Sequence, residues 1–163
     1  MWAHYWKRER AEDGEGTFVG HSASSVFRQR GVKSGDRMYV ISVLGGRLRV
    51  IGRLDVEDVV TQKRADELFG RHLWEAPEHV VARPGSGSQR RLDAFVPDHR
   101  LSELELVGPD GEVVIAKLNR HGQVDVLNLQ GLREITPRAA TLLDQVLGLK
   151  PEFDISVKGA DSI

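Results

Sequence analysis

A histidine stands beside three serines in the segment GHSASS, residues 20–25. Histidine and serine side by side could act as a general base and its nucleophile. A nucleophile elbow has the form G-x-S-x-G, which this segment lacks, and catalytic triads draw on residues distant in the sequence. Two other roles are open: a serine could cap a helix, or the segment could form the wall of a binding pocket. An enzyme with His21 as base and Ser22, Ser24 or Ser25 as nucleophile is the alternative to a binding role.

The sequence contains no pattern typical of a metal or nucleotide cofactor site. It has no cysteine, and none of its six histidines forms the i, i+4 pair of helical zinc sites. No G-x-G-x-x-G motif follows a predicted strand, and GSGS at residues 85–88 lacks the lysine and spacing of a phosphate-binding loop. We therefore expect neither a metal ion nor a cofactor.

Positive charge occurs only in local clusters, because the formal net charge of the chain is −1. A uniform attraction to nucleic acid or to an anionic membrane is therefore not expected. The cluster at 7–10, KRER, and the pair Arg90 and Arg91 flank aromatic or small-residue segments. Phosphate contacts and aromatic stacking are two components of nucleotide recognition. We expect Arg28, Arg90 and Arg91 to be the phosphate contacts of any such site.

Several segments predict the elements that must position these residues. In MWAHYW, alternation places Trp2, His4 and Trp6 on one face of a strand. A short helix capped by Ser22 or Ser24 should end at Gly31, and Thr136, Pro137 and Gly148 mark the start and end of a C-terminal helix. Two strands should pair around Gly45-Gly46. A further helix should end at Gly70. Strands are predicted at 79–83, at 124–129, at 132–135 and on both sides of the turn GPDG (108–111). Of the two strands beside that turn, the first, at residues 101–107, could be a helix instead.

Strands come first, short helices are inserted between them, and a helix closes the chain. This order predicts an α+β fold, with a small, mainly antiparallel curved sheet or β-barrel. A length of 163 residues suits one domain, expected at residues 1–148, with a loosely ordered tail at 149–163. No apolar run is long enough to span a bilayer, and the aromatic, then charged, start is unlike a signal peptide. We expect a cytoplasmic protein without membrane partners.

The chain resembles the EVE branch of the PUA-like superfamily. The resemblance is carried by K-x-G-D at 33–36 before an apolar strand and by I-G-R-L at 51–54, with YW at 5–6 and LQGLREIT at 129–136. PUA-like domains are small β-barrels that bind RNA or modified bases, and EVE domains have a pocket suited to a flipped-out base. The resemblance implies a pocket lined by Trp6, the segment His21 to Ser25 (with Ser22 and Ser24), Tyr39 and Trp74.

This chain lacks the tryptophan and the asparagine-containing stretch that EVE proteins carry where HSASSVF stands. His21 and the serines would have to supply those contacts. The leading hypothesis is a non-enzymatic domain that binds a nucleobase, a nucleotide or modified nucleic acid. Besides the enzyme above, a protein-interaction module with exposed strands is a further alternative.

Overall fold

The computed structural model describes residues 1–13 and 16–150. The strands are β1 (Trp2–Tyr5), β2 (His21–Ser24), β3 (Arg37–Leu44), β4 (Arg47–Thr61), β5 (Glu78–Ala82), β6 (Glu105–Val107), β7 (Val113–Ile115) and β8 (Leu132–Ile135). The helices are α1 (Arg8–Glu12), α2 (Phe27–Arg30), α3 (Gln62–Phe69) and α4 (Pro137–Leu147), with 3₁₀ helices η1 (Asp98–Glu103) and η2 (Val126–Asn128). Most of the predicted tail, residues 151–163, lies outside the described part of the chain.

The strands form one mixed sheet in the order β2-β5-β4-β3-β1-β8-β6-β7. β1 runs parallel to β3, and the other neighbouring strands are antiparallel. The α+β class and the mainly antiparallel sheet are therefore confirmed. The sheet is open, with β2 and β7 at its two ends, so a closed barrel, the other form predicted, is wrong.

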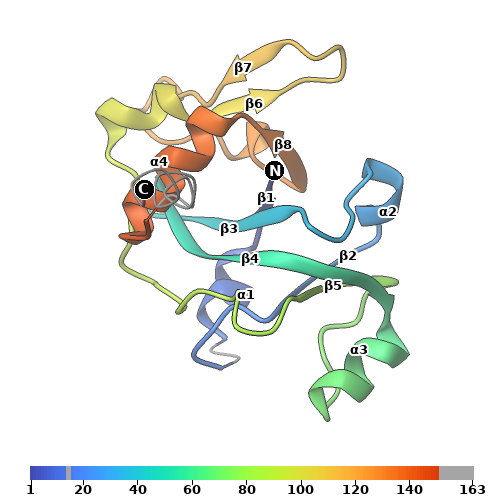
Figure 1. Ribbon diagram of the computed structural model, residues 1–163. Coiled ribbons are helices and arrows are strands. Elements are labelled where there is room, and N and C mark those ends of the chain that lie inside the picture. The colour runs from blue at the N-terminus through green and yellow to red at the C-terminus, as the bar shows by residue number, and fades with distance from the viewer. Residues whose placement is uncertain (14–15, 151–163) are drawn as a thin grey trace, which may run out of the picture.

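The β2 end of the sheet curls back toward β1. These two strands are four positions apart, which in a flat sheet would separate them by about 19 Å. Side chains nevertheless bridge them, because Ser22 on β2 accepts a hydrogen bond from the Trp6 indole just after β1. Only strong curvature of the intervening strands brings these residues together (Figure 1).

The β3–β4 hairpin forms the centre of the sheet and separates two cores. Gly45 and Gly46 form its turn with φ angles of 58° and 75°, as the sequence predicts. Met38 and Val40 pack with both buried tryptophans and Phe27 in the core inside the curl. Residues at alternate positions of β3 pack instead in a second core under α4. A bulge in β4, opposite Val40/Ile41, shifts the register and adds to the curvature.

Local signals place α4 and α3 correctly. Thr136 Oγ1 accepts from the amide of Ala139, Pro137 opens α4, and Gly148 ends it in the left-handed conformation. Gly70 ends α3 in the same way. The second core includes the buried residues of α4, which packs against β4 and β6 and is bonded to β3 through Asp144 and Tyr39 (Figure 1).

Three local predictions need correction. Residues 21–24 form strand β2, and α2 starts after Val26 without a side-chain cap, so neither Ser22 nor Ser24 caps it. Residues 126–128 form η2 rather than part of a strand at 124–129, because Asp125 accepts from the amide of Leu127 and turns the chain. Residues 101–107 divide between the end of η1 and β6.

Within residues 1–13 and 16–150, no helix has the length and apolar character needed to cross a membrane.

Candidate functional site

Four aromatic rings meet near the curled end of the sheet. The rings of Trp6 and Trp74 are 4.7 Å apart in an edge-to-face arrangement. The imidazole of His21 lies 5.3 Å from the Trp74 ring and 5.2 Å from Phe69. Trp6 follows β1, His21 begins β2, and Trp74 lies in the loop between α3 and β5, so the curl assembles the cluster from distant segments. We call Trp6, His21, Phe69 and Trp74 the aromatic cluster.

Trp6 is fixed in place by hydrogen bonds from its backbone and its side chain. Its amide donates to the carbonyl of Ile41 at 2.8 Å, and its indole Nε1 donates to Ser22 Oγ at 2.9 Å. Only 4% of its surface is exposed. Trp6 therefore forms the rigid base of the aromatic cluster, whereas half-buried Trp74 presents the accessible ring.

Ser22 also bonds to His4, whose Nδ1 lies 2.5 Å from Ser22 Oγ. Burial lowers the pKa of His4 to about 4, so its ring is neutral at pH 7. Ser22 is 0% exposed and already accepts from Trp6. A serine so enclosed cannot reach a substrate carbonyl, and the histidine beside it is a weak base. The contact is suited to holding Trp6 in place rather than to nucleophilic catalysis.

His21 is on the opposite face of β2 from Ser22, because successive side chains of a strand alternate. Among the described residues, His21 makes no hydrogen bond with Ser22, Ser24 or Ser25, so the base–nucleophile alternative finds no support. Its Nε2 is buried without a hydrogen-bond partner. Burial, followed by His79 and three nearby arginines, lowers the pKa of His21 to about 4. Its neutral ring has an unused hydrogen-bonding atom beside Trp74.

Cationic side chains surround the aromatic cluster. The guanidinium carbon of Arg10 lies 4.4 Å from the centre of the Trp74 ring, and that of Arg90 lies 5.6 Å from Trp6. Arg90 also donates to the carbonyl of Ala11, which ties it to α1. Arg71 is close enough to help lower the pKa of His21. An anionic group near Trp74 would therefore have Arg10 within reach, although Glu75 lines the same cavity and Glu9 and Asp13 line the adjoining hollow.

Trp6 and Trp74 both line a cavity of about 290 Å³. Lys7, Arg10 and Glu75 form part of its wall, and His4 reaches it from inside the curl. A second hollow of about 540 Å³ adjoins it and shares Lys7, Arg10, Trp74 and Glu75. The first is near the lower size limit of small-molecule sites, and the second extends it over the surface.

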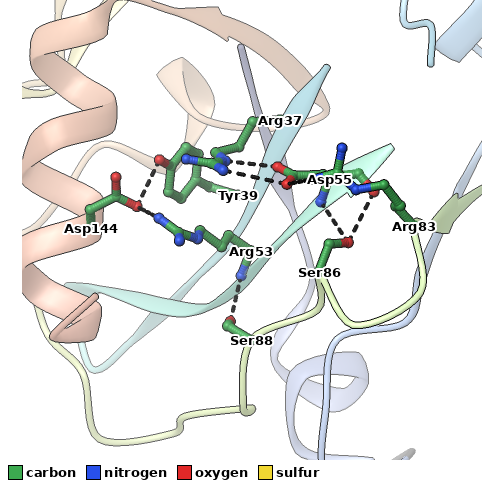
Figure 2. Close-up of polar contacts among 8 residues, drawn as sticks. All are labelled: Arg37, Tyr39, Arg53, Asp55, Arg83, Ser86, Ser88 and Asp144. Carbon is green, nitrogen blue, oxygen red and sulfur yellow. Dashed lines mark hydrogen bonds and ion pairs between the residues drawn. The ribbon is translucent and has the colours of Figure 1, made fainter. Parts of the chain in front are cut away.

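The remaining pocket residues predicted from the sequence lie elsewhere. Ser24 Oγ accepts from the amide of Val26 at the end of β2, and Ser25 is exposed beyond it. Tyr39 is in the core under α4, where its hydroxyl donates to Asp144 at 2.8 Å (Figure 2). Alternation along β3 turns Tyr39 away from the tryptophans, so its placement with Trp6 is corrected.

Of the three arginines expected to contact phosphate, one borders the aromatic cluster. Arg90 faces Trp6, as described above. Arg28 donates to the carbonyl of Val59 and pairs with Glu78, which fastens α2 to the sheet. Arg91 pairs with Asp93 at 2.9 Å. Arg28 and Arg91 serve local contacts here.

Sequence reasoning did not assign His4, Phe69 or Arg10 to the site. The KRER cluster at 7–10 was a signal for Arg10, since it follows Trp6 directly. No local pattern marks Phe69, which reaches His21 only through the packing of α3 against β5. In the part of the chain that the structure describes, no three His, Asp or Glu side chains are grouped as metal ligands.

Comparisons of this chain with protein-family models, with curated proteins and with solved structures gave no match.

Proposed function

We propose that this chain is a non-enzymatic binding domain that holds a nucleobase, of a nucleotide or of modified nucleic acid, against Trp74. The resemblance to EVE and other PUA-like domains suggests this ligand class. The observation that carries the proposal is the stacking of Arg10 on the half-buried ring of Trp74 at the mouth of a cavity. A guanidinium and a nucleobase are both flat groups that stack on indole, so the base would take the place of Arg10.

Three features around Trp74 suit this role. Trp6 supports the Trp74 ring edge-on and is itself fixed by Ser22, so the stacking surface is preorganised. The cavity of about 290 Å³ beside Trp74 leaves room next to this ring for a flat ligand. Arg10 and Arg90 would then attract the phosphate attached to the base.

A serine hydrolase is disfavoured by the same geometry. Ser22 is enclosed and bonded to Trp6, while His21 faces away from it. Ser25 is exposed, but no base is bonded to it among the described residues. A binding role needs neither contact.

Anisotropy titrations with fluorescein-labelled RNA and DNA oligonucleotides, single- and double-stranded, with and without methylated bases, would test the proposal. We expect saturable binding of at least one class. Trp74→Ala should weaken it about 5-fold to 150-fold, since stacking on one aromatic residue contributes about 1–3 kcal/mol. Trp74→Phe should retain most of the affinity.

Phe18→Ala is the matched control, because Phe18 is an exposed aromatic residue outside the aromatic cluster, with 61% of its surface accessible. It should leave the affinity unchanged. The proposal is wrong if no oligonucleotide binds, or if Trp74→Ala and Phe18→Ala weaken binding equally.

A further inference from the structure

The loop between α3 and β5 that carries Trp74, residues 72–77, is held without backbone pairing. Among the described residues, no backbone–backbone hydrogen bond includes a residue of this segment, which we call the Trp74 loop. Side chains of α3 instead bond to the backbone of Leu73 and of Ala76. These two residues precede and follow Trp74 in the chain. Contacts that fix their backbone therefore also fix where the side chain of Trp74 begins.

Gln62, the first residue of α3, contacts the Trp74 loop at both of these positions. Its Nε2 donates to the carbonyl of Leu73 at 3.3 Å, and its Oε1 accepts from the amide of Ala76 at 2.9 Å. Nε2 also donates to Oδ1 of Asp66, one turn further along α3, at 2.8 Å. The carbonyl and the carboxylate can only accept, and the backbone amide can only donate, so these partners determine which end of the Gln62 amide is the oxygen. One side chain thus holds the loop on both sides of Trp74.

A further contact joins Gln62 to the sheet. Its Oε1 lies 2.8 Å from Nε2 of His79 on β5. Since an amide oxygen only accepts, Nε2 of His79 carries a proton and donates it. His79 is 0% exposed and Gln62 is half-buried, so removing one partner leaves the other without full access to water. Gln62 therefore ties the Trp74 loop to α3 and to β5.

The start of the Trp74 loop has anchors besides Gln62. Asp66 Oδ1 accepts from the amide of Leu73 at 2.8 Å, and Asp66 Oδ2 lies 2.8 Å from Nδ1 of His72. The side chain of Leu73 is buried in a small core that includes Ala65 of α3 and Val81 of β5. In the second half of the loop, the bonded amide is that of Ala76, and its acceptor is Gln62. Loss of the Gln62 amide should therefore release the part of the loop that follows Trp74.

We infer that Gln62 is a positioning residue for Trp74. By fixing the backbone of Leu73 and Ala76, it holds the indole between them in its place 4.7 Å from the ring of Trp6. Gln62 lines neither of the two hollows beside Trp74, so it acts through the loop and not on a ligand. Its effect on ligand affinity rests on the function proposed above, whereas its effect on the position of Trp74 does not.

The ligand-free protein, labelled with ¹⁵N-tryptophan, gives the first test. Gln62→Leu removes every hydrogen bond of the amide, so it should move the indole N–H signal of Trp74 and leave that of Trp2 in place. Gln62→Glu should also move the Trp74 signal, because the carboxylate has no donor for Asp66, and it serves if circular dichroism shows that Gln62→Leu does not fold. Gln130→Leu is the matched control, since Gln130 is exposed and outside α3 and the loop, and it should move neither signal. An unchanged Trp74 signal in a folded Gln62 variant would overturn the inference.

A double-mutant cycle on oligonucleotide binding then tests whether Gln62 acts through Trp74. Gln62→Leu should weaken binding of the tightest oligonucleotide by about 5-fold or more, because the stacking ring is no longer held in place. In the Trp74→Ala background, the same change should alter the affinity by less than about 2-fold. Equal losses in the two backgrounds would contradict the inference. If no oligonucleotide binds, the function proposed for the aromatic cluster is wrong, and the signal of Trp74 in the ligand-free protein still decides whether Gln62 positions it.

Discussion

The indole of Trp6 donates a hydrogen bond of 2.9 Å to the hydroxyl of Ser22, which joins the end of β1 to the outermost strand β2. No backbone pairing joins these two strands in the described sheet. The side-chain contact, together with His4, links the two strands across the curl of the sheet. Because Trp6 supports Trp74, the same contact also determines where the accessible aromatic ring lies.

Ser22→Ala should therefore destabilise the protein. It leaves Trp6 Nε1 and His4 Nδ1 buried without their partner, which costs about 1–3 kcal/mol. Ser25→Ala, at an exposed position three residues on, should change the free energy of unfolding by less than about 0.5 kcal/mol. Urea unfolding followed by circular dichroism measures both. Equal free energies of unfolding for the two variants would show that the hydrogen bonds of Ser22 do not stabilise the fold.

Stability should fall as the pH drops below 6.5. Burial lowers the pKa of His4 to about 4, and burial with nearby cations does the same for His21. Their folded pKa values are below the unfolded value, so unfolding takes up protons between about pH 6.5 and 4. Each histidine then removes about 2 kcal/mol of stability by pH 5.

Urea unfolding at pH 7.5 and pH 5 checks this expectation. His4→Gln should reduce the loss of stability between the two values, even if the variant is less stable at both. His121→Gln, which changes an exposed histidine, should retain the full loss. A pH dependence unaffected by His4→Gln would mean that His4 does not titrate as its burial implies.

Arg10 and Arg8 belong to the same short helix, but only Arg10 lies over Trp74. If a ligand phosphate contacts Arg10, Arg10→Ala should weaken oligonucleotide binding and reduce the slope of log K against log salt by about 1. Arg8 pairs with Glu12 at 3.1 Å, so Arg8→Ala should leave the slope unchanged. The comparison requires affinities at several salt concentrations. Identical slopes in the two variants would place the phosphate away from Arg10.

The sequence predicts the elements best where local chemistry determines them. Thr136, Pro137 and Gly148 define α4, and Gly45-Gly46 defines the central hairpin, because caps and turns depend on a few neighbouring residues. The predicted strand at 124–129 is wrong because an aspartate side chain captures a backbone amide and starts a 3₁₀ turn there. Apolar alternation alone does not reveal such a competing contact.

The site was predictable only in part, for a geometric reason. The prediction placed Trp6, the segment His21 to Ser25, Tyr39 and Trp74 around one pocket. The structure brings Trp6, Ser22, His21 and Trp74 near one another, whereas Ser24 and Ser25 lie at and beyond the end of β2. Tyr39 lies on the other face of β3. The sequence did not predict this, because alternation shows which residues of a strand share a face but not which face packs against the tryptophans. The curl that decides this depends on long-range packing, which sequence periodicity does not specify.

The same limit applies to charged residues. Arg28 and Arg91 stand in basic pairs just as Arg10 and Arg90 do, and nothing local distinguishes them. The structure separates them by their partners: Glu78 and Asp93 engage the first two, whereas aromatic rings lie beneath the others. Distinguishing these roles requires knowing which strands the sheet brings together.

Indole N–H resonances give the most direct test of the central claim that a nucleobase stacks on Trp74. The chain has three tryptophans, so ¹⁵N-tryptophan labelling yields three signals, assigned with single Trp→Phe variants. Trp2 is an internal control, because it lies outside the aromatic cluster. Its Nε1 donates a hydrogen bond of 3.0 Å to Asp36. On titration with the oligonucleotide that binds most tightly, or with nucleoside monophosphates, the Trp74 signal should shift with saturation and Trp6 by less, while Trp2 stays in place. An unchanged Trp74 signal at saturating ligand, or equal shifts of Trp2 and Trp74, would contradict the claim.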